Sequence, residues 1–379
     1  MGRNFSKLQK LLDSFLELGI PGTGCEVWHE GQPAFRYYNG MADREAGIPV
    51  DEKTFWKYFS VSKVFTCTAA LQLFEQGRFL LSDPLSWYLP EFADMQVSLG
   101  DGRIRPAERP ILIRDLFTMT AGLTYNLGTA SIREGIRETS GQAPTREMMK
   151  YLAKDPLSFD PGEAWQYSLC HDVLGALVEV LSGQNFDAYL REHVLAPADV
   201  EEITFHPSEE QQLRMARIYD YDWEHRTSTI PEREMNLSVG PAYESGGAGL
   251  CGTTEACAKF GEALISGKLL SLGTVDLMRT NFLNDEQLEM FQRGREPGVR
   301  RSVDRAGYGY GLGVRTMIDL AEGGSNGSLG EFGWGGALGA YLLLDPARQL
   351  VLFYAQSTMR PPAEYTRSRL RNVLYACVD

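Results

Sequence analysis

Apolar residues recur at helical spacing in three stretches of the chain. The clearest stretch runs from Ser60 to Gln76 (SVSKVFTCTAALQLFEQ), where the pattern predicts a helix that begins at Ser60. The first twenty residues contain a second stretch (LQKLLDSFLELGI), in which charged residues interrupt the apolar positions. This pattern predicts an amphipathic helix and not a signal peptide. Glu364 to Cys377 is also helical in pattern.

Apolar runs of strand length lie near both ends of the chain. Each pair of runs flanks a short segment of turn residues, which predicts two hairpins. The runs are Thr23–Trp28 and Ala34–Tyr38 around Glu30-Gly31-Gln32-Pro33, and Gly336–Leu344 and Gln349–Gln356 around Asp345-Pro346-Ala347-Arg348. Together with the terminal helices, they predict one antiparallel sheet covered by helices.

The middle of the chain has a different periodicity from its two ends. Residues 60–204 carry mostly helical patterns, without a comparable strand signal. We therefore expect an α/β (α+β) fold in which residues 1–59 and 205–379 form a sheet domain flanked by the N- and C-terminal helices. Residues 60–204 form an inserted, mostly helical domain, and the active site lies at the boundary between the two.

Four segments lack a clear pattern and are expected to be loops. Two of them, 94–110 and 155–166, interrupt the helical region, and two others, 205–244 and 283–306, are polar and rich in Glu and Arg. Long loops in a compact domain are often functional, so we expect the polar pair to border the substrate cleft.

Ser60 and Lys63 are a candidate nucleophile and its base. Residues three apart on a helix share a face, so the predicted helix places the Lys63 ammonium beside the Ser60 hydroxyl. The helix N-terminus and a partly dry pocket both lower the pKa of such a lysine, and the neutral amine takes the serine proton during attack on an acyl carbon. The motif is short, and the alternative is that Ser60 caps a helix and Lys63 lies on the surface.

Further motifs follow Ser60-Val61-Ser62-Lys63 in a characteristic order. They include Leu81-Ser82-Asp83-Pro84-Leu85, Pro161-Gly162-Glu163, Tyr167-Ser168-Leu169, Ser245-Gly246-Gly247, Tyr310-Gly311-Leu312-Gly313 and Trp334-Gly335-Gly336. From about residue 20 to its end, the chain resembles the serine β-lactamase/penicillin-recognising superfamily. Within that superfamily it is most similar to the class C β-lactamases and the family VIII carboxylesterases. The resemblance implies a β-lactamase/transpeptidase-like fold and hydrolysis through an acyl-enzyme.

Two motifs depart from the class C pattern. That class has Tyr-x-Asn and Lys-Thr-Gly where this chain has Tyr167-Ser168-Leu169 and Trp334-Gly335-Gly336. Both changes replace polar groups that hold the amide and carboxylate of a β-lactam with apolar side chains. The combination resembles the family VIII esterases, which implies a carboxylesterase for small or short-chain esters with weak or no β-lactamase activity.

The resemblance also implies roles for individual groups in the reaction. Tyr167 relays a proton, first to the leaving alkoxide and later from water. The backbone N–H groups of Ser60 and Ala337 form the oxyanion hole. Without the surrounding motif, Tyr167 reads as a core aromatic with a satisfied hydroxyl.

Four further residues are expected to bind the substrate. Gly335 and Gly336 let an edge strand approach it closely, because no side chain intervenes. Trp334 forms a wall for the acyl or alcohol group, although a buried strand aromatic explains it equally well. Leu169 occupies the position of the amide-bearing asparagine.

Composition narrows the class of protein further. The chain has 379 residues, a net charge of −13 and a pI near 5, which argues against nucleic acid or an anionic membrane as partner. No apolar run is long enough for a membrane span. Six cysteines without paired spacing and the lack of an export signal predict reduced thiols and a cytoplasmic location. Five scattered histidines form no ligand cluster, so we expect no metal and no cofactor.

The motifs leave three other functions open. An acyl-enzyme on Ser60 is equally an intermediate for an acyltransferase, which passes the acyl group to an alcohol or amine. A β-lactamase or D-amino peptidase uses the same residues. A non-catalytic penicillin-recognising protein would not need Ser60, Lys63 and Tyr167 together. The natural substrate and the oligomeric state do not follow from the sequence.

Overall fold

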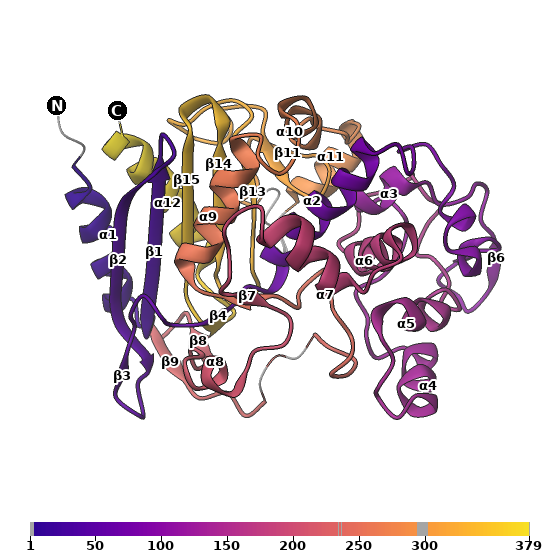
Figure 1. Cartoon of the computed structure of the whole chain (residues 1–379), viewed down its shortest axis with the longest axis horizontal. Coiled ribbons are helices and arrows are strands. Elements are labelled where there is room, and N and C mark those ends of the chain that lie inside the picture. The colour runs from indigo at the N-terminus through magenta and orange to yellow at the C-terminus, as the bar shows by residue number, and fades with distance from the viewer. Residues whose placement is uncertain (1–3, 234, 236, 294–301, 379) are drawn as a thin grey trace.

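An eight-stranded sheet forms the centre of the computed structural model, which describes residues 4–233, 235, 237–293 and 302–378 (Figure 1). The strand order is β11-β12-β13-β14-β15-β1-β2-β3, and every neighbouring pair is antiparallel. Because β1 pairs with β15, the two ends of the chain meet inside one sheet. The strands are β1 (Gly22–His29), β2 (Gln32–Asp43), β3 (Ile48–Pro49), β11 (Tyr308–Tyr310), β12 (Arg315–Met317), β13 (Phe332–Gly335), β14 (Tyr341–Asp345) and β15 (Leu350–Ala355).

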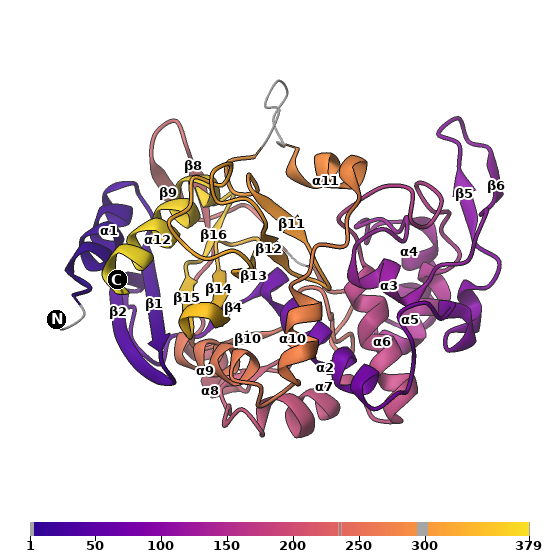
Figure 2. The same ribbon diagram turned by 90° about the horizontal axis from the view of Figure 1, so that it is seen from above.

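Helices cover both faces of this sheet, with α1 (Ser6–Glu17) and α12 (Ala363–Val378) on one side and α9 (Thr254–Ile265) on the other (Figure 2). The side chains of β14 alternate between the two layers. Leu342 and Leu344 join the core that contains α9, whereas Leu343 joins the core that contains α1 and α12. A strand buried on both faces reads as a continuous apolar run, which is why the sequence predicted these strands strongly.

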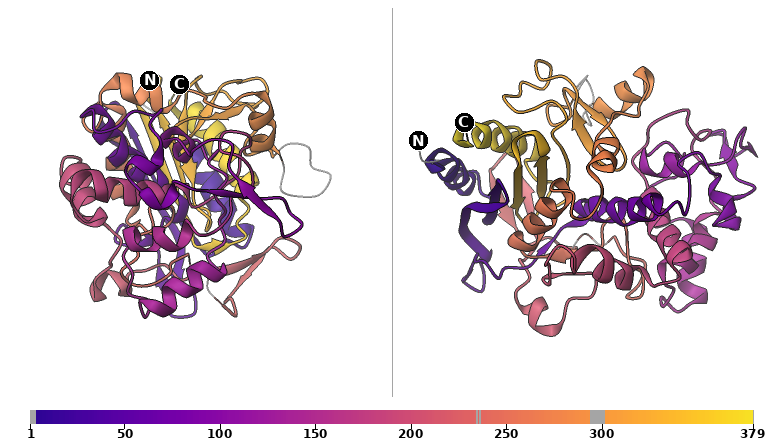
Figure 3. Two further views of the ribbon diagram at one scale, coloured as in Figure 1. Left: turned by 90° about the vertical axis from the view of Figure 1, so that its right-hand side faces the viewer. Right: turned by 45° about the horizontal axis from the view of Figure 1, so that its top comes forward.

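Helix α2 (Ser62–Glu75) is buried on nearly every side and packs against α6 (Cys170–Ser182). In the right-hand view of Figure 3 it runs from the sheet toward a group of helices. The remaining α-helices are α3 (Ile113–Phe117), α4 (Ala130–Glu138), α5 (Thr145–Leu152), α7 (Phe186–Tyr189), α8 (Glu209–Leu213), α10 (Leu272–Met278) and α11 (Asp285–Gln292). Shorter elements are the 3₁₀ turns η2 (Leu85–Trp87), η3 (Pro90–Phe92) and η5 (Pro346–Arg348) and the π-helix η4 (Leu190–Leu195). This arrangement confirms the predicted mixed fold with a large antiparallel sheet.

Three smaller sheets complete the described part of the chain. One of them joins β4, just before Ser60, to two strands from much later in the sequence. The sheets are β4 (Trp56–Lys57), β10 (Cys251–Gly252) and β7 (Ile203–Thr204); β16 (Thr358–Met359), β8 (Tyr219–Asp222) and β9 (Thr227–Thr229); and β5 (Gln96–Ser98) with β6 (Ile104–Pro106).

The ends of several strands differ from the predicted ones. The first hairpin turns at Glu30 and Gly31 alone, because Gln32 and Pro33 already belong to β2. The strand predicted to begin at Gly336 begins at Tyr341, because the preceding residues form a turn in which the Gly336 N–H donates to the Ala340 carbonyl (2.8 Å).

The predicted loops also contain more regular structure than expected. Segment 94–110 contains the β5–β6 hairpin, 205–244 contains α8, β8 and β9, and 283–306 contains α11. Residues 294–301 of the last segment lie outside the described residues. Segment 155–166 contains no helix and only an isolated bridge at Leu157. The division into residues 1–59 with 205–379 and residues 60–204 stays a prediction.

Candidate active site

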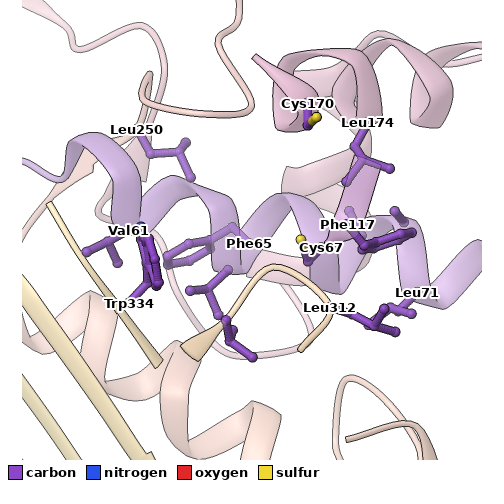
Figure 4. Packing of buried hydrophobic residues seen from close by; sticks show 14 of the residues in the cluster. Val61, Phe65, Cys67, Leu71, Phe117, Cys170, Leu174, Leu250, Leu312 and Trp334 are labelled. Carbon is purple, nitrogen blue, oxygen red and sulfur yellow. The ribbon is translucent and has the colours of Figure 1, made fainter. Parts of the chain in front are cut away.

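Ser60 lies in the 3₁₀ turn η1 (Phe59–Val61), which continues directly into α2. The regular helix thus begins two residues later than predicted. Phe59 has a φ of 47°, in the left-handed region that bulky residues rarely adopt. Its side chain packs with Ile218 and Leu338, and such packing can hold a strained backbone in place. Figure 4 shows Val61 and Trp334 close together at this end of α2.

Lys63 points back toward Ser60 from the first turn of α2. Its Nζ lies 3.3 Å from the Ser60 Oγ and donates a hydrogen bond to the Gly247 carbonyl at 2.6 Å. The side chain is fully buried, which excludes the alternative of a surface lysine. Its ammonium lies 4.6 Å from the centre of the Tyr167 ring and 5.2 Å from that of Tyr125. The structure therefore brings together the three residues predicted to perform the reaction.

A buried carboxylate, Asp172, stands near this group on α6. Its Oδ1 accepts hydrogen bonds from the Tyr243 hydroxyl (2.9 Å) and the Ser245 hydroxyl (2.6 Å). Burial raises the pKa of Asp172, while the bond from Ser245 and the charge of Lys63 oppose that rise. The carboxylate and the ammonium thus stabilise each other's charged form inside the protein.

The pKa values of Lys63 and Tyr167 move in opposite directions. Burial lowers the pKa of Lys63, but the nearby Tyr125, Tyr167 and Asp172 reverse this and raise it above its usual value. Burial raises the pKa of Tyr167, but the Lys63 charge and hydrogen bonds with Lys63, Ser60 and Trp334 bring it below its usual value. The expectation of a lysine with a lowered pKa is therefore wrong, because the electronegative surroundings outweigh desolvation.

Trp334, on β13, contacts Tyr167 directly. Its indole Nε1 donates a hydrogen bond to the Tyr167 hydroxyl at 3.2 Å, and the two rings stack with centroids 5.9 Å apart. The rings of Tyr125, Trp165 and Tyr310 extend this aromatic contact. Trp334 is 7% exposed, so it is at once a buried strand aromatic and a neighbour of the candidate reaction centre.

The two glycines after Trp334 serve packing in this structure. A Cβ on Gly335 would lie 2.3 Å from the Arg367 guanidinium carbon, and one on Gly336 would lie 2.3 Å from the Tyr58 carbonyl oxygen. The sequence predicted an edge strand here, but β13 lies inside the sheet, where it pairs with β12 and β14. Pairing with β12 stops at Gly333, however, so the end of the strand is open on that side.

Ala337 and Leu169 differ in exposure. Ala337 is partly exposed and directly follows Gly336, which packs on the backbone just before Ser60. Leu169 is only 2% exposed, belongs to the main core, and donates its backbone N–H to the Thr124 carbonyl (3.1 Å). Contact of either residue with a substrate stays a prediction.

Sequence reasoning missed the parts of the site that surround Lys63. Tyr125 had no motif to mark it, and neither Asp172 nor Gly247 was assigned a role, although both lie in quoted or adjacent motif segments. A polar residue such as Asp172 within an apolar helix (CHDVLGALVEVL) is the signal that could have identified the carboxylate, because buried charges are usually paired.

The described residues show neither a metal site nor a membrane span. They include no cluster of His, Cys, Asp or Glu side chains that could hold a metal ion. None of the helices described combines the length and apolar character that crossing a membrane requires. All six cysteines are buried and free of disulfides. A cavity of about 580 Å³ near Arg191, Thr204 and His206 is lined by none of the residues around Ser60.

The sequence is similar to one known protein family and to enzymes that match it over most of its length. The Beta-lactamase family pattern matches residues 6–376. Esterase EstB of Burkholderia gladioli is 29% identical over 394 residues, which cover 98% of this chain and 95% of EstB. Monacolin J acid methylbutanoyltransferase of Aspergillus terreus is 27% identical over 316 residues, covering 79% and 75% of the two chains.

The fold also resembles that of a solved hydrolase structure over nearly its whole length. That of "EstCE1, a hydrolase with promiscuous acyltransferase activity" has a TM-score of 0.79 at 25% identity and covers 97% of both chains. Because the family pattern spans nearly the whole sequence, this chain belongs to the Beta-lactamase family.

Proposed function

We propose that this protein is a serine carboxylesterase that acts on small or short-chain esters through an acyl-enzyme. The observation that carries the proposal is the contact of the buried Ser60 and Lys63 with Tyr167, in which the pKa of the phenol is lowered and that of the amine is raised. Such a pair of displaced pKa values is typical of a site built for proton transfer. The relationship to EstB and EstCE1 supports hydrolysis of esters.

Tyr167, as a phenolate, takes the proton from Ser60 while the Ser60 Oγ attacks the ester carbonyl carbon. The Lys63 ammonium stays protonated and stabilises the phenolate, a role that its raised pKa favours. The backbone N–H groups of Ser60 and Ala337 bind the carbonyl oxygen as it becomes negative. Tyr167 then gives its proton to the leaving alkoxide. In deacylation it takes a proton from the attacking water and gives it to the Ser60 Oγ as the bond between Oγ and the acyl carbon breaks, which releases the acid and restores the enzyme.

Ester substrates suit the walls of this site better than β-lactams do. The indole N–H of Trp334 is already engaged with Tyr167, and Leu169 has no hydrogen-bonding side chain. A β-lactam bound here would bury its amide and carboxylate beside Trp334 and Leu169, and neither side chain would offer it a hydrogen bond. Each unpaired polar group costs about 1–3 kcal/mol.

Parallel kinetics on p-nitrophenyl esters of increasing acyl length and on nitrocefin test the proposal. We expect catalytic efficiency on the acetate or butyrate to exceed that on nitrocefin by several orders of magnitude. Ser168→Ala is a control variant that should keep the wild-type efficiencies on both substrates, because this buried hydroxyl adjoins Tyr167 in sequence but donates to the sulfur atoms of Met119 and Cys170. Comparable efficiencies on butyrate and nitrocefin would refute the esterase assignment.

Acyl transfer is the second candidate function. EstCE1 is named as a hydrolase with promiscuous acyltransferase activity, and the Aspergillus terreus relative is named as a methylbutanoyltransferase. Ser60 is only 6% exposed, and the ammonium of its neighbour Lys63 lies over the rings of Tyr125 and Tyr167, an environment that admits water sparingly. Product analysis with added alcohols distinguishes the two, because a transferase forms the new ester in preference to the free acid.

A further inference from the structure

Arg367 connects the C-terminal helix to the backbone beside Ser60. It lies in the second turn of α12, and only 11% of its side chain is exposed. Its Nη2 donates hydrogen bonds to the carbonyls of Gly336 (3.0 Å) and Ala340 (3.2 Å). These two carbonyls stand at the two ends of the turn between β13 and β14. One guanidinium therefore holds both ends of this turn.

The turn carries the backbone group assigned to the oxyanion hole. It is closed by hydrogen bonds from the Gly336 N–H to the Ala340 carbonyl (2.8 Å) and from the Gly339 N–H to the Gly336 carbonyl (3.1 Å). The Ala337 N–H has no hydrogen-bond acceptor among the described residues. Gly336 also packs on the Tyr58 carbonyl, two residues before Ser60. The turn is thus fixed next to the nucleophile with one N–H left available.

We propose that Arg367 is a positioning residue that fixes the turn of residues 336–340 and so directs the Ala337 N–H at the developing oxyanion. The inference rests on the proposed esterase function. An oxyanion-hole donor is effective only within about 2.7–3.1 Å of the charge, so a small shift of the turn would weaken it. The guanidinium binds both carbonyls through Nη2 while Nη1 stays paired with Asp304, whereas a lysine ammonium has a single nitrogen for all three partners.

Two features of the surroundings hold Arg367 in this position. Its Nη1 donates to the Asp304 Oδ2 (2.9 Å), and Asp304 is also paired with Arg315 (2.8 Å). Burial raises the pKa of Asp304, but the two arginines lower it below its usual value, so the carboxylate stays charged. Gly335 provides the space, since a side chain there would collide with the guanidinium. Gly335 of the Trp-Gly-Gly motif thus has a packing reason in its contact with Arg367, and its contact with a substrate stays a prediction.

Hydrolysis of an ester and its matched thionoester tests the inference. The thiocarbonyl places the negative charge on a larger sulfur atom that accepts hydrogen bonds weakly, so the oxyanion hole contributes less to its hydrolysis. The ratio of kcat/KM for the ester to that for the thionoester therefore reports on the oxyanion hole. It does not depend on the fraction of enzyme that is folded.

We expect Arg367→Gln to lower kcat on the ester about 10-fold or more with little change in KM, a partial loss of what one donor provides. The ester-to-thionoester ratio should fall with it, and Arg367→Lys should lie between Gln and wild type. Arg371→Gln is the matched control, because Arg371 is a buried arginine on the same helix that contacts the Tyr308 hydroxyl and the Gly323 carbonyl. Its ratio should equal that of the wild type.

Each contrary result has a distinct meaning. An unchanged ratio in Arg367→Gln overturns the inference, as does an equal fall in Arg371→Gln, which would show a general effect of losing buried charge. If the wild type hydrolyses no ester, the proposed function itself fails. A high wild-type ratio that Arg367→Gln leaves intact would instead keep the function and remove only the role of Arg367.

Discussion

Removal of the Lys63 charge tests the assignment of Tyr167 as the base. The ammonium lies 4.6 Å from the centre of the Tyr167 ring, and two unit charges at that distance attract by about 3.6 kcal/mol at an effective dielectric constant of about 20. A phenolate without this partner is correspondingly harder to form, because burial alone raises the pKa of Tyr167. This energy corresponds to a rate loss of about 400-fold, which sets the order of magnitude expected for Lys63→Met at neutral pH.

The sign of the pH dependence follows from the same contact. Tyr167 must be ionised to accept the Ser60 proton, so activity rises as pH passes upward through its pKa. Loss of the cation raises that pKa, and the acidic limb of the kcat/KM profile should move to higher pH. Part of the lost activity should therefore return in alkaline solution. The assay is the pH profile of p-nitrophenyl butyrate hydrolysis for the wild type and Lys63→Met.

Tyr167→Phe completes this test. It should lower kcat by about 100-fold or more, as is common when a general base is removed. The double variant with Lys63→Met should lose much less than the product of the two single losses, since the two groups act as one unit. An acidic limb that does not move, or fully multiplicative losses in the double variant, would refute the shared proton pathway.

Further changes test the nucleophile and the stability of the sheet. Ser60→Ala should abolish ester hydrolysis and labelling by a fluorophosphonate while leaving the circular dichroism spectrum unchanged; more than a few per cent of residual activity would contradict the nucleophile assignment. Burial raises the pKa of Glu26 on β1 to about 7, so the folded state keeps a proton there that the unfolded state releases above about pH 4.5. The free energy of unfolding should therefore fall by up to about 3 kcal/mol as pH rises through this window, and Glu26→Gln should reduce the fall. Urea unfolding at about pH 4.5 and about pH 8 measures this difference, and an equal fall in the two proteins would exclude Glu26 as the cause.

Local sequence was sufficient for the elements and for part of the site. The continuous apolar runs that became β14 and β15 could be predicted because strands buried on both faces need apolar residues at every position. Ser60 and Lys63 could be paired because helical spacing brings residues three apart to one face. The order of motifs along the chain then indicated the family, and Tyr167 with it.

Boundaries and loops were less predictable, since tertiary contacts decide them. The turn of residues 336–340 takes the place of the start of a predicted strand, and Arg367, from the far end of the chain, hydrogen-bonds to both ends of this turn. The two-residue strand β10 pairs only with β4 and β7, which are distant in sequence, and its own sequence carries little local signal.

The electrostatic state of the site was decided by the tertiary structure alone. The position of Lys63 near a helix N-terminus and its burial away from water, both expected from the sequence, favour a lowered pKa. The pKa of Lys63 is raised instead, because folding places Tyr125, Tyr167 and Asp172 around it. Spacing along one helix thus determined which residues meet, whereas charges from segments far apart in sequence determined which of them holds the proton, because Coulomb interactions depend on distance in space.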